Sequence, residues 1–372
     1  MRIGVIGLGS MGKRRVRDLR ALGHDVVGFD PRAERRAQAV ELFGATSVTD
    51  FAALIDARPD ALVISTPPDQ HLEYYERAFA ARVPFFSEMN VHLPPPAWFA
   101  AREAGGGVRG YPSATWQFYP LFGVLREQLR QLGHDQVNTV HYHYGGYLPL
   151  WHPWERYDEF YAGSRRRVAA AREMVPFELE WMRWVFGPVR SVCCMHDRRS
   201  EWTTDIDDTY LLLLDFESGL RGSLFSEVHQ VAPFRTARVS CRRQSFLVDM
   251  SVHELRRYDL DTDSWRLLKP PGLRSLGSFD FEQIYRAEIG TFVAALEGRS
   301  TYPKTWADDR HLSDVLYAAE ESWRQRAWVD VADVALAYDG ISWAADPPPG
   351  PAEPDETSGS LVAQADPAAV RA

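Results

Sequence analysis

The first thirty residues hold a glycine-rich turn between two short apolar runs, and this pattern limits the possible folds most strongly. The turn reads G-x-G-x-x-G and is formed by Gly7, Gly9 and Gly12. Around it we expect a strand at 3–6, a helix at 11–22 and a second strand at 26–29. This order of elements is typical of a parallel doubly wound sheet. The sequence therefore predicts an α/β protein that begins with a Rossmann domain.

Each glycine of the turn has a structural role. Gly7 permits the tight bend, Gly9 lets a diphosphate approach the backbone, and Gly12 lets the helix pack close to the strand. Ser10 directly precedes the expected helix and Met11 begins it, so their backbone N–H groups lie at a helix N-terminus, which attracts anions. We therefore expect this turn to bind the diphosphate of a dinucleotide cofactor.

Asp30 ends the second strand, near the spacing expected for an acid that binds ribose hydroxyls. Its carboxylate would repel the 2′-phosphate of NADP, so the sequence favours NAD. Arg32 and Arg35 follow closely, however, and either could make a bidentate contact to that phosphate. NADP remains an alternative cofactor.

The alternation of strands and helices continues after Asp30. We expect strands at 45–48, 61–65 and 84–87, with helices at 50–57 and 72–80 between them. In a doubly wound sheet the carboxyl ends of the strands meet in one crevice, where the cofactor lies. The side chains that follow these strands should contact the cofactor, namely Thr66, Pro67, His71, Glu88 and Met89.

Three of these segments, GLGSMG at 7–12, STPPDQH at 65–71 and SEMN at 87–90, together resemble the N-terminal half of the glucose–fructose oxidoreductase/inositol dehydrogenase (Gfo/Idh/MocA) family. In that family the third segment normally reads Glu-Lys-Pro, and its lysine acts beside the nicotinamide. Here Met89 and Asn90 stand at the lysine and proline positions. The resemblance implies that Glu88 is a retained active-site carboxylate without its usual catalytic neighbour. Alternatively, Glu88 is a helix-capping or loop acid.

The second half of the chain predicts an α+β domain with a mostly antiparallel sheet. Strand pairs are expected in 207–229, 238–250 and 254–268, followed by helices at 282–297 and 308–325. From residue 346 the sequence lacks apolar periodicity. We expect a dinucleotide-binding domain at 1–118, a substrate and oligomerisation domain at 119–343, and a disordered tail at 344–372.

Residues 147–167 are rich in aromatic and basic side chains and resemble a segment found in sugar-modifying branches of the family. Tyr147, Trp151 and Trp154 offer flat faces on which a sugar ring could stack. Arg166, with an arginine on each side, could bind a carboxylate or phosphate. Alternatively, the aromatic residues pack beneath the sheet and the arginines form a solvated surface. The first interpretation suits an anionic sugar derivative.

Residues 172–192 resemble a further family segment that carries a histidine between two aspartates. By this resemblance the histidine position holds Phe177, the later aspartate position holds Glu180 and the earlier one holds Glu173. Pro176 predicts that a helix begins there, which would leave Glu173 on the preceding loop. Phe177 and Glu180 are three residues apart and should share a helix face.

Two positions that handle protons in relatives therefore hold Met89 and Phe177, and neither side chain can transfer a proton. Oxidation of an alcohol needs an acid or base within hydrogen-bond reach of the oxygen. The candidates are Glu173, Glu180, His152 or a tyrosine, unless the substrate is an imine or a conjugated system. Each candidate can also be read as an ordinary packed or surface residue.

Composition excludes several other classes of protein. The formal net charge of -9 argues against a nucleic-acid partner, and the sequence has no apolar run long enough to span a membrane. Three cysteines without C-x-x-C spacing indicate neither disulfides nor a thiolate metal site. We expect no metal, a cytoplasmic location and, from the resemblance, a homo-oligomer (dimer or tetramer) formed through the C-terminal sheet.

Three functions remain open. The first is an NAD(P)-dependent oxidoreductase with altered proton-transfer residues, acting on a sugar, cyclitol or related small molecule. The second is a redox-neutral enzyme that oxidises its substrate transiently, as some relatives do in glycoside cleavage. The third is a non-catalytic protein that binds NAD(P) as a partner or sensor. We favour the first.

Overall fold

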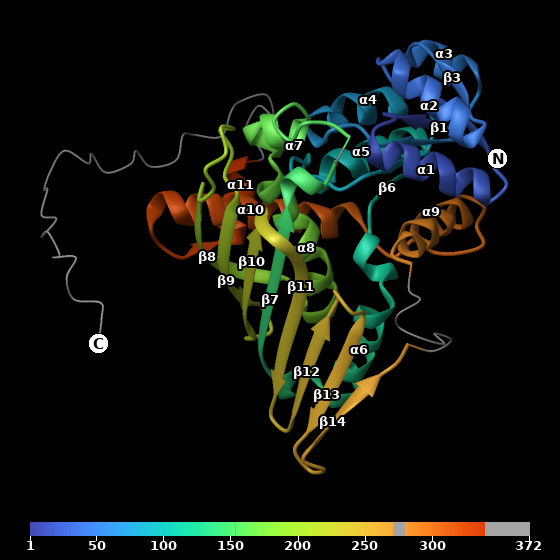
Figure 1. Cartoon of the computed structure of the whole chain (residues 1–372). Helices are drawn as coiled ribbons and strands as arrows, with labels where there is room; N and C mark the ends of the chain where they lie inside the picture. The colour runs from blue at the N-terminus through green and yellow to red at the C-terminus, as the bar shows by residue number, and fades with distance from the viewer. Residues whose placement is uncertain (153, 271–279, 339–372) are drawn as a thin grey trace, which may run out of the picture.

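The computed structural model describes residues 1–152, 154–270 and 280–338. They form two lobes, each built on a β-sheet (Figure 1). The N-terminal lobe lies at the upper right of this view, and the C-terminal sheet extends downward from it. The tail predicted at 344–372 lies outside the described residues.

The N-terminal lobe contains a six-stranded parallel sheet, which confirms the predicted Rossmann domain. The strand order is β3-β2-β1-β4-β5-β6, so the winding reverses between β1 and β4. Ligands bind at this switch point in such folds. The central strands are apolar and covered on both faces, as in β4, which is wholly buried. The strands of this sheet are β1 (Arg2–Ile6), β2 (Asp25–Phe29), β3 (Thr46–Val48), β4 (Ala61–Ile64), β5 (Phe85–Ser87) and β6 (Gly110–Pro112).

Helices connect these strands, and most lie where the sequence predicts them. The helix after the glycine turn is α1, and the helix after the STPPDQH segment is α4. The helices of this lobe are α1 (Ser10–Ala21), α2 (Ala33–Phe43), α3 (Phe51–Asp56), α4 (His71–Ala81) and α5 (Pro96–Gly106), with a 3-10 turn η1 (Pro68–Gln70) before α4. Both α2 and α5 lie in stretches for which no helix was predicted.

The C-terminal lobe contains a nine-stranded sheet in the described residues, in the order β14-β13-β12-β11-β7-β10-β9-β8-β15. Only β7 and β10 pair in parallel, which confirms the mostly antiparallel sheet. The predicted strand pairs correspond to β9–β10, β11–β12 and β13–β14. The strands are β7 (Val137–Tyr147), β8 (Val189–Asp197), β9 (Thr209–Phe216), β10 (Arg221–Glu227), β11 (His229–Cys241), β12 (Gln244–Asp249), β13 (Glu254–Asp259), β14 (Ser264–Leu268) and β15 (Val329–Asp330).

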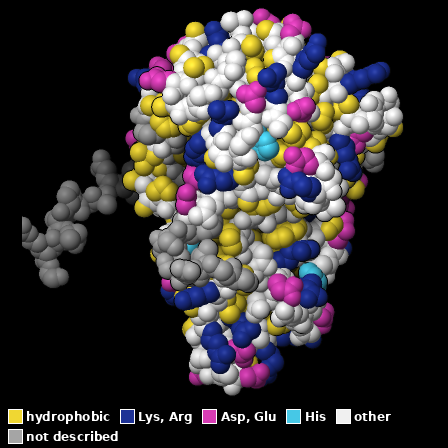
Figure 2. Space-filling model, turned by 90° about the vertical axis from the view of Figure 1, so that its right-hand side faces the viewer, with side chains coloured by type: hydrophobic (Ala, Val, Ile, Leu, Met, Phe, Trp, Pro, Cys, Tyr) yellow, Lys and Arg dark blue, Asp and Glu magenta, His cyan; other side chains and the backbone are white. Residues whose placement is uncertain are grey.

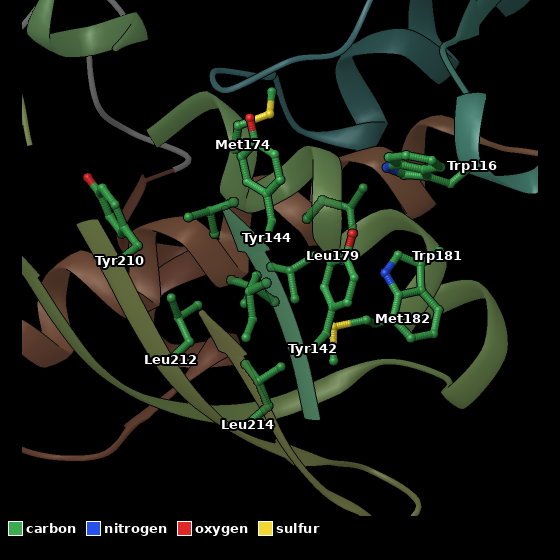
Figure 3. Packing of buried hydrophobic residues seen from close by; sticks show 14 of the residues in the cluster. Trp116, Tyr142, Tyr144, Met174, Leu179, Trp181, Met182, Tyr210, Leu212 and Leu214 are labelled. Carbon is green, nitrogen blue, oxygen red and sulfur yellow. The ribbon is translucent and has the colours of Figure 1, made fainter. Parts of the chain in front are cut away.

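One face of this sheet packs on the helix α8 (Ala170–Phe186). Alternate residues of the strands, such as Leu212 and Leu214 on β9, are buried in the same cluster as Leu179 and Trp181 of the helix. Figure 3 shows these side chains around one core, with Tyr144 extending from β7 toward Met174 of α8. Alternate side chains of the strands and the side chains on one face of the helix therefore share one core.

The last helices return to the N-terminal lobe. Ile289 and Phe292 of α9 are buried together with Val16 of α1, and Trp306 of α10 stacks on Phe99 of α5 with ring centroids 3.9 Å apart. Late parts of the chain therefore complete the core of the first lobe. The remaining helices are α6 (Pro120–Leu132), α7 (Tyr161–Ser164), α9 (Glu282–Leu296), α10 (Trp306–Gln325) and α11 (Val331–Tyr338), with 3-10 turns η2 (Thr115–Phe118), η3 (His134–Gln136), η4 (Leu148–Leu150) and η5 (Arg166–Val168).

The predicted start of α8 at Pro176 is wrong, because the helix begins at Ala170 and contains Pro176 in its interior. A proline inside a helix removes one backbone hydrogen bond. Burial of the first turn favours the longer helix, since Ala170 and Ala171 are wholly buried and Arg172 pairs with Glu320 at 2.5 Å. Glu173 consequently lies in the first turn of α8 and not on a loop.

Basic and acidic side chains are interspersed on the face shown in Figure 2. In the described part of the chain, no helix combines the length and apolar character needed to cross a membrane.

Candidate active site

A cavity of about 770 Å³ lies where the two lobes meet. Its lining includes residues that follow β1, β2, β4 and β5 in the first lobe, and residues of 144–177 from the second. The cavity therefore occupies the carboxyl ends of the parallel strands, where a doubly wound sheet binds its ligand. No group of three or more His, Cys, Asp or Glu side chains in the described ranges could hold a metal ion.

The glycine turn is shaped to receive a diphosphate. A Cβ on Gly12 would lie 1.8 Å from the carbonyl oxygen of Gly7, and Gly7 itself has a φ of +84°. A Cβ on Gly9 would meet only the Arg35 guanidinium, 3.5 Å away, so this side of the turn is open to the cavity. Helix α1 has no side-chain cap at its N-terminus, which leaves the N–H groups around Ser10 and Met11 available. The residues present fit the dinucleotide.

Asp30 follows strand β2, lies beside this turn and is almost completely buried. One carboxylate oxygen accepts a hydrogen bond from the Leu8 amide at 2.8 Å, and the other accepts one from the Arg32 amide at 2.9 Å. Arg35 approaches to 3.7 Å. Asp30, Arg32 and Arg35 all line the cavity.

The STPPDQH segment contributes Thr66 and Pro67 to the cavity lining, but His71 faces away from it. The hydroxyl of Thr66 is buried without a hydrogen-bond partner in the described residues. His71 is wholly buried; its Nε2 donates to the Thr66 carbonyl at 2.9 Å, and its Nδ1 lies 2.8 Å from Asn90 Oδ1. Burial lowers the pKa of His71. His71 therefore positions two cavity loops, although it was predicted to contact the cofactor.

Glu88 lies at the cavity wall but forms a two-point ion pair with Arg15 of α1, at 2.6 and 3.0 Å. Arg15 is wholly buried and also donates to Glu288 of α9 at 2.6 Å. Glu288 in turn accepts from the Ala114 amide at 2.6 Å. The lone acid after β5 thus joins the end of that strand to the helix of the glycine turn, a role that no local sequence pattern indicates.

The two altered family positions both reach the cavity. Met89 and Phe177 are in its lining, and Phe177 packs on Trp116 with ring centroids 5.1 Å apart. Both side chains present apolar surface to the ligand space. Neither side chain can transfer a proton, so proton transfer in this cavity would need another group.

Glu173 is the carboxyl group best placed for that task. It lines the cavity one turn before Phe177, and Tyr161 donates to its two oxygens at 3.0 Å each. Burial raises the pKa of Glu173 to about 8. A carboxyl group with this pKa exists in both protonation states near neutral pH, as a general acid–base catalyst requires.

The other two proton-transfer candidates are placed less well. Glu180 is buried outside the cavity lining, where it accepts from the Trp116 amide at 3.0 Å. Burial raises the pKa of Glu180 to about 7. His152 lines the cavity but its Nδ1 lies 2.8 Å from Glu155, and burial lowers its pKa.

Of the predicted substrate residues, some line the cavity and others lie outside it. Tyr147 and Trp151 line the cavity. Trp154 is 63% exposed and stacks on His152, outside the lining. Arg166 also lies outside and pairs with Asp205 and Asp207, whereas its neighbour Arg165 lines the cavity.

Sequence reasoning missed four residues that shape the site, namely Arg15, Tyr144, Tyr161 and Arg235. Arg15 joins the glycine helix to Glu88, and the other three line the cavity. The sequence analysis included a tyrosine among the proton-transfer candidates but did not identify it as Tyr161. The strand period places Tyr144 and Tyr142 on one face of β7, but it does not say that this face reaches the cavity.

The comparisons with known proteins agree with this architecture. The family model described as "Oxidoreductase family, NAD-binding Rossmann fold" matches residues 1–93, and the model described as "GFO/IDH/MocA C-terminal domain" matches residues 125–256. No curated protein sequence matches the chain.

Solved structures with the same fold cover nearly the whole chain. An oxidoreductase from Agrobacterium radiobacter in complex with NAD+, L-tartaric acid and magnesium is 14% identical with a TM-score of 0.77, and the match covers 90% of this chain and 99% of that one. Levoglucosan dehydrogenase in complex with NADH is 18% identical with a TM-score of 0.75, covering 89% and 99%. An NAD-binding oxidoreductase from Klebsiella pneumoniae is 17% identical with a TM-score of 0.74, covering 89% and 99%.

At these identities the structural likeness establishes the fold. The two family models together match more than half of the chain, in the order N-terminal then C-terminal domain. The protein belongs to the Gfo/Idh/MocA oxidoreductase family, whose N-terminal domain is an NAD-binding Rossmann fold.

Proposed function

We propose that the protein is an NAD-dependent dehydrogenase of a sugar, cyclitol or related small molecule, in which Glu173 transfers the proton. The observation that carries the proposal is the buried Glu173–Tyr161 pair in the wall of the cofactor cavity. Its raised pKa, about 8, gives this site a proton carrier that Met89 and Phe177 cannot provide.

In the oxidative direction, ionised Glu173 accepts the proton of the substrate hydroxyl. In the reductive direction the protonated carboxyl group returns that proton to the carbonyl oxygen. Bound NAD supplies the hydride acceptor or donor for the substrate carbon. Tyr161 fixes the orientation of the Glu173 carboxyl by donating to both of its oxygens. Apolar Met89 and Phe177 exclude water from the reacting carbon, which strengthens these polar interactions.

Aromatic walls support a sugar-like substrate. Tyr144, Tyr147 and Trp151 line the cavity on the side of the second lobe and offer ring faces for stacking. Levoglucosan dehydrogenase, which shares the fold, has been solved with levoglucosan and with L-sorbose. Both observations favour a polyhydroxylated substrate.

Replacing Asp30 with Ala should lower the preference for NAD over NADP by about tenfold. The carboxylate repels a 2′-phosphate, and its removal leaves Arg32 and Arg35 free to attract one. The measurement is the dissociation constant of each reduced cofactor. The double variant Asp30→Ala/Arg35→Ala is the control and should lose most of the gained NADP affinity. An unchanged preference in Asp30→Ala would contradict the assignment.

We also propose a homo-oligomer formed through the uncovered face of the C-terminal sheet. Met195, Leu211 and Phe225 lie side by side on β8, β9 and β10, and Met195 and Leu213 are half exposed. We expect Leu213→Glu to convert a dimer or tetramer into a monomer while cofactor binding persists. Light scattering of the wild type and the variant measures this, and a monomeric wild type would contradict it.

The cytoplasmic location remains a proposal as well. All three cysteines are free thiols, which suits a reducing compartment.

Turnover tests the proposed activity. The purified full chain is incubated with NAD+ and a panel of aldoses, cyclitols, aldonates and uronates, and the absorbance of reduced nicotinamide is followed. Net reduction with at least one member is the expected result. Cofactor binding with product formation but no net absorbance change would instead indicate a redox-neutral enzyme. Binding without any turnover would indicate a sensor.

A further inference from the structure

Arg235 extends from β11 into the cavity with part of its guanidinium unused. Its Nε donates to Glu178 at 3.0 Å, but Nη1 and Nη2 donate to no acceptor in residues 1–152, 154–270 and 280–338. The side chain remains 27% exposed, and the residue is part of the cavity lining. Arg14 and Arg165, which also line the cavity, pair through their guanidinium groups with Glu282 and Asp69.

The backbone fixes where this guanidinium lies. Arg235 is paired with Tyr144 on β7, immediately after a register shift between His229 and Phe234. Such irregularities re-aim side chains and are common beside binding sites. The guanidinium carbon lies 4.3 Å from the centre of the Tyr144 ring and 5.4 Å from that of Trp116. These aromatic faces hold the cation in place before any ligand arrives.

The same cation lies close to the proposed reaction centre. Trp116, beside Arg235, also packs on Phe177. Glu173, Tyr144 and Arg235 line the same cavity. A single small molecule bound there can place its reacting hydroxyl group at Glu173 and another of its groups at Arg235.

The two Nη groups of Arg235 favour a carboxylate as their ligand. Glu178 occupies Nε, so the two Nη groups form a two-point donor that matches the two oxygens of a planar carboxylate. Burial acts to lower the pKa of Arg235, but Glu178 and the neighbouring tyrosines outweigh it and raise the pKa above its ordinary value. The group therefore stays charged at every physiological pH. A doubly charged phosphate would find one partly neutralised cation here, which suits it less well.

We infer that Arg235 binds the carboxylate of the substrate, which makes the substrate a polyhydroxy acid of the aldonate or uronate class. The inference rests on the function proposed above. The predicted anion contact was Arg166, which lies outside the cavity; the inference assigns it to Arg235 of strand β11, which lines the cavity.

Matched pairs of ligands test this inference. D-gluconate and D-glucitol share a six-carbon chain and differ only at the carboxylate, and D-glucuronate with D-glucose and D-galacturonate with D-galactose are further pairs. The full chain is first titrated with NADH, and each ligand is then titrated into the NADH complex by calorimetry. At least one acid should bind about tenfold or more tightly than its neutral partner.

The variants Arg235→Met and Arg235→Lys identify the group responsible. Arg235→Met should weaken binding of the preferred acid roughly 10- to 100-fold and leave binding of the neutral partner unchanged. Arg235→Lys keeps the charge but not the two-point donor and should show an intermediate loss. Arg235→Met leaves Glu178 buried without its cation, so Arg235→Met/Glu178→Gln is made as well, because the amide still accepts from Tyr142.

The outcomes separate this inference from the proposed function. Normal NADH binding with no acid preferred over its neutral partner overturns the carboxylate site alone. An acid preference that survives in the folded Arg235 variants also overturns it. Failure of the wild type to bind NADH would overturn the proposed function instead. Loss of the acid preference in folded, NADH-binding variants supports the carboxylate site.

Discussion

Replacing Glu173 with Gln is expected to lower kcat/KM for the substrate by about 10²- to 10⁴-fold, the usual contribution of a general acid–base group. The amide keeps an oxygen that accepts from Tyr161, so the shape of the pocket is retained. The amide cannot exchange a proton with the substrate oxygen. NADH affinity should stay within a few-fold of the wild type, and steady-state kinetics with calorimetry measure both quantities.

Glu180→Gln is the matched control for this prediction. Glu180 lies on the same helix and is also buried with a raised pKa, about 7, but it faces the Trp116 amide and not the cavity. We expect its effect on kcat/KM to be much smaller than that of Glu173→Gln. The reverse order of effects would reassign the proton carrier to Glu180.

The pH dependence of the wild type follows from the same group. Burial raises the pKa of Glu173 to about 8, so the base form needed for oxidation accumulates as the pH rises through 8. Oxidative kcat/KM should therefore increase with pH and level off above about 8, while the reductive rate should fall over the same interval. Glu173→Gln should abolish this inflection.

Replacing Arg15 with Met should lower the free energy of unfolding by about 3–5 kcal/mol. The wholly buried guanidinium binds Glu88 and Glu288, and its loss would leave two carboxylates facing each other without a cation. It also donates to the Tyr285 carbonyl at 3.0 Å, which ties α1 to α9. Denaturant unfolding, followed by circular dichroism, measures the change.

Arg17→Met on the same helix provides the comparison. Arg17 is partly exposed and pairs with Glu282 and Asp18, so its removal should cost at most about 1 kcal/mol. Equal losses in the two variants would show that the buried Arg15 ion pairs contribute no more than the partly exposed Arg17 pairs. The Arg15 variant should also bind NADH more weakly, because the helix of the glycine turn loses its anchor.

The sequence predicted the structure best where the structure depends on residues that are close together in the chain. Gly7, Gly9 and Gly12 satisfy backbone constraints within one turn, and Asp30 follows at a fixed spacing, so the Rossmann domain could be predicted directly. The strand pairs of the second lobe could also be predicted, because each pair consists of two strands that follow each other in the chain. Pro176 misled because tertiary burial of the first turn of α8 outweighed the local preference of proline.

The parts that could not be predicted depend on contacts between distant segments. Arg15 meets Glu88 and Glu288 across 73 and 273 residues, and no periodicity encodes such a pairing. The choice between Arg165, Arg166 and Arg235 as cavity residues depends on loop path and strand register, which the linear pattern leaves open. Glu173 was identified as a candidate by its position, but its burial and its partner Tyr161 emerge only from the folded chain.

Calorimetric titration of the purified chain with NADH tests the central claim most directly. The turn at Gly7–Gly12 and the N-terminus of α1 predict one dinucleotide bound per chain, with a dissociation constant between about 1 μM and 1 mM, the usual range for enzyme ligands. The absence of binding by either NADH or NADPH at millimolar concentration would contradict the account.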